Sequence, residues 1–185
     1  MLEEIYPQTE QKMKKALEVF EEHLRGLRTG RANPALLQPV KVDYYGSVMP
    51  LSQLASISAP DARTLVVQPW DSKASSIIEK AILEANLGLN PAARGDAIYV
   101  AIPVLTQDRR KELARTARQY AEEARVAVRG VRREALEDIR ELQHEKLISE
   151  DDSRRGQERL QTLTDRYVQK TDELLAQKEQ EILGE

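Results

Sequence analysis

The sequence contains no cysteine, which excludes disulfide bonds, thiol catalysis and cysteine-ligated metals. Aromatic residues make up only 4% of its 185 residues, and the longest apolar run, residues 97–105, is interrupted by a proline. Such a run is too short to cross a membrane. The first residues carry Glu3 and Glu4 and no apolar stretch, so they do not form a secretory signal. These absences predict a soluble cytoplasmic protein, for which we expect no metal, no other cofactor and no membrane contact.

Charged residues are abundant instead, at 32% of the chain, and this share is typical of long solvated helices. Three segments repeat apolar residues at the spacing of one helix face. They span residues 3–28, residues 106–148 and the stretch after Ser149. The apolar positions are Met13, Leu17, Phe20, Leu24 and Leu27 in the first segment, Leu113, Ala117, Tyr120, Ala124, Val128, Val131, Ala135, Ile139 and Leu142 in the second, and Leu160, Leu163, Tyr167, Thr171, Leu174 and Ile182 in the third.

The ends of these helices carry recognisable signals. Pro7 is tolerable only in a first turn, which places the start of the first helix near Glu3. Gly30 and Pro34 then end that helix. Before the third helix, Ser149 and Asp152 have the spacing of a capping box.

Residues 31–105 have a different pattern. Segments 40–45, 63–70 and 97–103 are rich in the β-branched and aromatic residues of strands, and residues 71–86 predict a short helix that Asp71 opens. The glycines and prolines between them, together with Asp61, predict turns; they are Gly46, Pro50, Pro60, Gly88, Pro91 and Gly95.

The chain therefore predicts an α+β protein with two domains. Residues 1–30 and 106–185 would form an elongated antiparallel three-helix bundle, because a single amphipathic helix has no core of its own. Residues 31–105 would form a small β/α/β domain inserted after the first helix. The two chain segments that join the domains lie side by side in this scheme, and the freedom of Gly30 favours a hinge there.

Positive charge is concentrated in the second helix, where residues 109–133 hold nine basic and three acidic groups. At 100° per residue, seven of the basic residues fall within an arc of about 100°, nearly opposite the apolar stripe. We expect this arc to face solvent, interrupted only by Glu122. We call it the basic arc; it consists of Lys111, Arg115, Arg118, Arg125, Arg129, Arg132 and Arg133.

The ordinary interpretation of such an arc is a solvated helix face. Three observations favour the binding of a polyanion instead. Clustered cations repel one another and so destabilise the helix unless a partner neutralises them, and arginine suits bidentate contacts with phosphate. Arg25, Arg28 and Arg31 could also extend the basic surface. Phe20 and Trp70, the only aromatic residues besides tyrosine, are interpreted as structural. Backbone and shape recognition of structured RNA therefore fits better than the reading of single-stranded bases.

Two other classes of protein fit the sequence less well. An enzyme is disfavoured because the chain has no phosphate-binding glycine loop, and because His23 and His144 lie on separate helices among charged residues. The acidic run at residues 150–152 is an ordinary feature of a helix start and does not indicate a metal. A coiled-coil adaptor would explain the helices but would leave both the inserted domain and the basic arc without a role.

Several long motifs resemble the bacterial ribosome recycling factor family along the whole chain. They include LRTGRANPALL, VDYYG, LSQLASISAPDARTLVVQPWD, IEKAI, LGLNP, PVLTQDRRKEL, ARVAVRGVRREA and ISEDD. The resemblance implies an L-shaped, monomeric protein that binds the post-termination ribosome through large-subunit ribosomal RNA. It also implies that elongation factor G, hydrolysing GTP, would act on it to split the ribosome into subunits and release mRNA and tRNA.

The same resemblance assigns roles to individual positions. The RNA-contacting arginines of the family correspond to Arg28, Arg31, Arg129, Arg132 and Arg133, to which the basic arc adds Arg118 and Arg125. The hinge of the family corresponds to Thr29 and Gly30 on one chain segment and to Pro103, Val104, Leu105 and Thr106 on the other. Gly130 departs from the family pattern, in which we expect a larger polar residue at this position. A glycine there would reduce the local stiffness of the helix and leave the arginine positions unchanged.

Overall fold

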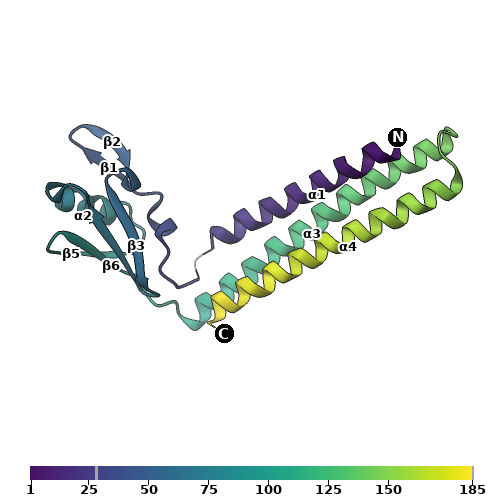
Figure 1. The fold of residues 1–185 in the computed structure, drawn as a ribbon. Helices are drawn as coiled ribbons and strands as arrows, with labels where there is room; N and C mark the ends of the chain where they lie inside the picture. The colour runs from purple at the N-terminus through teal and green to yellow at the C-terminus, as the bar shows by residue number, and fades with distance from the viewer. Residues whose placement is uncertain (28, 185) are drawn as a thin grey trace. The chain divides into compact units, whose positions relative to one another are not determined.

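The computed structural model describes residues 1–27 and 29–184, and these divide into two compact units. The first unit comprises Met1–Thr29 and Gln107–Glu185, and the second comprises Gly30–Thr106. The first contains three long helices, the second a small β domain with one helix (Figure 1). The α+β class and the inserted β domain are thus as the sequence predicts.

The first unit is a bundle of α1 (Leu2–Arg25), α3 (Gln107–His144) and α4 (Glu150–Leu183), which lie side by side in Figure 1. Contacts between side chains give their directions. Lys12 on α1 pairs with Glu134 on α3, and His23 lies against Tyr120, so α1 and α3 run antiparallel. The helices α3 and α4 are also antiparallel, because their ion pairs follow a reversed order along the two chains: Arg118 with Glu179, then Arg125 with Asp172.

The apolar stripes form the bundle core. Met13, Phe20, Ile139, Leu160 and Ile182 have exposed fractions of 1% or less. The buried face of α3 is wider than the sequence predicts, because α3 packs on both α1 and α4. Ala114 and Ala121 lie in this additional buried strip. Short alanine side chains there allow α3 to approach a second helix closely.

The helix ends differ from the sequence prediction by a few residues. α1 ends at Arg25, with Gly26 as its C-cap, and not at residue 28 before Gly30. α1 begins at Leu2, so Pro7 lies inside the helix and not in its first turn. α3 ends at His144 and not at residue 148, because Lys146 adopts a φ of +61° in the turn that follows. The capping box at the start of α4 is confirmed: Ser149 Oγ accepts the Asp152 amide at 3.0 Å, and Asp152 accepts the Ser149 amide in return.

The second unit contains two antiparallel sheets. β1 (Lys41–Tyr44) and β2 (Ser47–Pro50) form a hairpin, and four further strands are arranged in the order β3-β4-β6-β5. Their bounds are Ala55–Asp61 for β3, Thr64–Pro69 for β4, Asn90–Arg94 for β5 and Ala97–Ala101 for β6. The single α-helix of the unit, α2 (Ser75–Glu84), follows a 3-10 turn at Ser72–Ala74.

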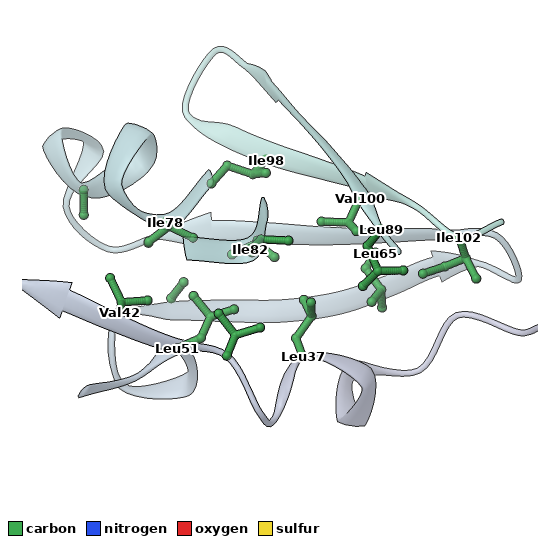
Figure 2. Close-up of a cluster of buried hydrophobic side chains, with 14 residues drawn as sticks. Leu37, Val42, Leu51, Leu65, Ile78, Ile82, Leu89, Ile98, Val100 and Ile102 are labelled. Carbon is green, nitrogen blue, oxygen red and sulfur yellow. The ribbon is translucent and has the colours of Figure 1, made fainter. Parts of the chain in front are cut away.

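The core of this unit lies between the four-stranded sheet, α2 and the hairpin. Leu65, Val67, Ile98 and Val100 alternate inward from the two central strands. Figure 2 shows their cluster, in which Ile78 and Ile82 of α2 lie beside side chains of the sheet and hairpin. This core is separate from the core of the bundle.

Three strands are absent from the sequence prediction. β2, β3 and β5 contain Pro50, Pro60 and Pro91, which the sequence predicts as turn residues together with Asp61, and that prediction is wrong at these four positions. β3 and β5 are the two edges of their sheet, and β2 is half of an isolated hairpin. Proline is tolerated at such edges because an outward position needs no amide donor. The interpretation of Trp70 as a structural residue is also wrong, since 69% of it is exposed.

We predict opposite outcomes for alanine at two helical glycines. A Cβ at Gly130 would have no atom within 4 Å, so Gly130→Ala should raise the free energy of unfolding by about 1 kcal/mol through helix propensity. A Cβ at Gly156 would lie 3.0 Å from Ile139 Cδ1 and 3.2 Å from Tyr6 Oη. Gly156→Ala should therefore destabilise the bundle, because overpacking outweighs the propensity gain. Urea unfolding measures both, and equal stabilisation by the two changes would contradict the tight packing at Gly156.

A second prediction concerns pH. The Asp71 carboxylate accepts the Lys73 amide and the Tyr44 hydroxyl, both of which hold its pKa below the ordinary value. A depressed pKa in the folded state adds stability above the unfolded pKa of about 3.9, and that stability is lost as the pH falls through the folded value. Asp71→Asn should remove this part of the acid sensitivity while leaving the rest. Unfolding curves of the two proteins between about pH 1.5 and 6 test this, because the difference develops below the unfolded pKa; parallel curves over that range would contradict it.

Candidate nucleic-acid interface

The basic arc lies on α3, but not all of it faces solvent. Only 20% of the Arg125 side chain is exposed. The expectation of a wholly outward arc is therefore wrong at this edge. The reason is the second packing partner: the strip of α3 beside Arg125 is buried against α4, and a single amphipathic stripe gives no sign of this.

Two arginines of the arc form ion pairs with carboxylates on α4. Arg118 Nε donates to Glu179 Oε1 at 2.6 Å, and Arg125 Nη2 lies 2.7 Å from Asp172 Oδ1. Partial burial opposes the charge of Arg125, but hydrogen bonds to Asp172 and Glu122 raise its pKa above the ordinary value. These two side chains are therefore partly neutralised by carboxylates of the chain itself.

The arc is less neutralised further along α3. The nearest carboxylate to Arg129 is Glu122, at 3.7 Å, and 47% of the Arg129 side chain is exposed. Arg132 donates from Nη1 to the amide oxygen of Gln161 at 2.9 Å. Its Nε is buried and has no hydrogen-bond partner within residues 1–27 and 29–184. Arg133 is exposed and, in the same part of the chain, makes no ion pair or hydrogen bond.

This gives the arc a strongly basic end at Arg129, Arg132 and Arg133, three arginines within five positions of a rigid helix. Arg140 is exposed seven residues after Arg133 and so lies on the same face. The basic arc predicted from the sequence does not include Arg140, because that arc covers residues 109–133 alone. The seven-residue spacing is the signal that would have identified it.

The other two predicted arginines do not belong to the described part of the bundle. Arg31 is exposed and belongs to the β domain unit, while the arc belongs to the bundle. Arg28 lies outside the described residues. The arc is therefore the part of the candidate site that the structure assembles on one element.

The predicted hinge residues lie where the chain passes from one unit to the other. The crossings fall between Thr29 and Gly30 and between Thr106 and Gln107. Gly30 has a φ of +81°, which favours glycine, and a Cβ there would lie 3.3 Å from Leu105 Cδ1. Of the remaining residues, Pro103 and Val104 are exposed.

The two histidines do not form a site of another kind. His23 and His144 are both exposed, and the His23 ring centroid lies 4.5 Å from that of Tyr120. In the described part of the chain, no three histidine or acidic side chains group as metal ligands would. No helix there has the length and apolar character needed to cross a membrane.

Comparison with known proteins adds to this geometry. The family model described as ribosome recycling factor matches residues 20–183. The ribosome-recycling factor of Thermus thermophilus is 55% identical over 183 residues, covering 99% of both chains. That of Carboxydothermus hydrogenoformans is 51% identical and covers all of both chains.

Two solved structures are similar over nearly the whole chain. One is a solution structure of a ribosome recycling factor, with a TM-score of 0.76, 48% identity, and coverage of 100% of this chain and 98% of that one. The other is the Thermus thermophilus factor, described with Escherichia coli elongation factor G as bound to a post-termination complex, with a TM-score of 0.66, 55% identity and 99% coverage of both chains. The family match, the full-length relatives and the shared fold together show that this chain belongs to the ribosome recycling factor family.

Proposed function

We propose that this protein recycles ribosomes after translation termination. It would bind the post-termination ribosome and, with elongation factor G and GTP hydrolysis by that factor, separate the subunits and release mRNA and tRNA. The support is the full-length match to ribosome-recycling factors, together with a similar structure that is bound with elongation factor G to a post-termination complex. A protein of this kind acts in the cytoplasm, as a monomer and not as an enzyme.

The surface proposed to contact large-subunit ribosomal RNA consists of five arginines of the basic arc together with Arg28 and Arg31. The five are Arg118, Arg125, Arg129, Arg132 and Arg133. The observation that carries this is the basic end of the arc, where Arg133 is exposed and pairs with no carboxylate in the described chain. Phosphate oxygens accept the planar guanidinium group in two parallel hydrogen bonds. Tyr120 is the one aromatic residue of α3, and its ring lies against His23 of α1, so contact with the RNA backbone fits better than stacking on bases.

Burial of the apolar stripes argues against the adaptor alternative. An adaptor needs an exposed seam for its partner helix. Here the stripes of all three helices are buried within one chain, with Met13, Ile139 and Leu160 fully covered. The charged outer face remains the feature available for a partner.

We further propose that Thr29 and Gly30, with Pro103, Val104, Leu105 and Thr106, form a hinge that subunit splitting requires. The chain crosses between the two units at these two places, and each crossing is short. Gly30 supplies a backbone conformation that other residues adopt only with strain.

The proposed function is tested by sedimentation of purified post-termination ribosomes. This protein, elongation factor G and GTP together should produce free subunits. Omission of any one of the three, or replacement of GTP by a non-hydrolysable analogue, should leave the ribosomes joined. Subunit release without this protein at an equal rate would contradict the proposal.

For the RNA contact, we predict that Arg133→Ala weakens ribosome binding by about 1.5–3 kcal/mol, the range for hydrogen bonds to charged groups. The change breaks no hydrogen bond or ion pair within the described residues, so the fold should be unaffected. The slope of log affinity against log salt should fall by about 1 if Arg133 neutralises one phosphate. Arg154→Ala is the matched control, because Arg154 is exposed on α4 and pairs with Asp151. Equal binding by the Arg133 and Arg154 variants would argue against the contact.

For the hinge, Gly30→Pro should slow subunit splitting more than it weakens binding, because proline holds φ near −65° and cannot adopt +81°. Gly95→Pro places the same strain at a φ of +61° in a turn within the β domain and serves as the control. Thermal unfolding verifies that both variants fold. Splitting at the normal rate by a folded Gly30→Pro protein would rule the hinge out.

A further inference from the structure

Glu122 is an acidic residue within the basic arc, on the exposed face of α3. Its side chain is 59% exposed and lies between Arg118, one turn before it, and Arg125 and Arg129, one and two turns after it. Glu122 Oε2 accepts a hydrogen bond of 3.0 Å from Arg125 Nη1, and Glu122 Oε1 lies 3.7 Å from Arg129 Nη1. One carboxylate therefore approaches two arginines of the proposed RNA-binding surface.

Neither contact is needed to hold the arginines in place. Arg125 is positioned independently by Asp172 on α4, through Nε at 2.9 Å and Nη2 at 2.7 Å. The distance from Glu122 to Arg129 is longer than a hydrogen bond, and exposed ion pairs of this kind contribute little to stability. Glu122 thus contributes little to the geometry of the surface.

Its charge has a larger effect on an approaching phosphate. A carboxylate on the arc repels the phosphate and occupies guanidinium donors that the phosphate would otherwise use. The acidic partners on α4 differ, because Asp172 and Glu179 join two helices and so also contribute to the packing of the bundle.

We propose that Glu122 is an intramolecular competitor of ribosomal RNA phosphate for Arg125 and Arg129, and that it limits the affinity and residence time of the protein on the ribosome. This inference rests on the proposed function. Most differences in affinity between related complexes lie in the dissociation rate, so a limit on affinity means faster release. Faster release benefits a factor that must leave one ribosome before it acts on the next.

Glu122→Gln tests the inference, since it removes the charge and keeps the size of the side chain. We expect about three- to tenfold tighter binding to purified post-termination ribosomes, from the Coulomb energy of one charge near the surface. The gain should lie mainly in a slower dissociation rate, which stopped-flow fluorescence of labelled protein measures. The unfolding temperature should equal that of the wild type, because the side chain is exposed.

Glu112→Gln is the matched control. Glu112 is 61% exposed on the same helix and pairs with an arginine three residues away, Arg109, at 2.8 Å. It lies 13 residues before Arg125 and 17 before Arg129, about 20 and 25 Å along the helix, and both distances exceed the screening length of about 8 Å at physiological salt. Glu112→Gln should therefore bind within about twofold of the wild type. An equal gain from both variants would reflect net charge alone and would overturn the competitor role, as would unchanged or weaker binding by Glu122→Gln.

Two further variants separate this inference from the proposed function. In a protein that already carries Arg129→Ala, Glu122→Gln should increase ribosome affinity by less than it does in the wild type, because one of the two arginines released by the substitution is absent. An equal increase in affinity would overturn the assignment to Arg129. Loss of binding by Arg129→Ala and Arg133→Ala, without a gain from Glu122→Gln, would overturn only the competitor role. Unchanged binding by both alanine variants would overturn the RNA-binding role of α3 itself.

Discussion

The packing of α3 between α1 and α4 is the constraint on which the rest of the bundle depends. A helix of 38 residues with nearly continuous charge on one side is not stable by propensity alone, and most of its stability comes from burying an apolar face. Here that face includes Ala117, Ala121, Val128 and Ile139, which are fully buried against two neighbours. Because α1 and α4 both pack along α3, the helix is rigid, and its arginines project from a rigid element.

The same packing divides the arginines into two groups. On the side of α3 that faces α4, Arg118 pairs with Glu179 and Arg125 pairs with Asp172, so carboxylates of the protein itself neutralise part of their charge. Further along the helix, Arg133 meets no carboxylate in the described residues and keeps its full charge for a partner. An arc that is uniform on a helical wheel is therefore uneven in the folded chain.

The β domain buries an apolar core of its own. Its two central strands supply Leu65, Val67, Ile98 and Val100, and α2 and the hairpin cover that face. Each edge strand carries one proline, Pro60 in β3 and Pro91 in β5, which has no amide N–H to donate and so blunts the edge against pairing with another strand. The unit thus keeps its own core, as an inserted domain must if it is to fold beside a separate bundle.

The sequence alone determined the class of the fold, the three bundle helices, the capping box at Ser149 and the family. These features depend on local spacing and on residues that are neighbours in the chain, and apolar periodicity records which face of a helix is buried. The edge strands were missed because their residues have weak strand propensity, and pairing with β4 and β6 makes them strands. Only the tertiary structure decided which arginines meet a carboxylate of another helix, because Glu179 and Asp172, the partners of Arg118 and Arg125 on α4, lie 61 and 47 residues further along the chain. A charge interaction depends on distance in space, and no pattern within one helix contains that distance.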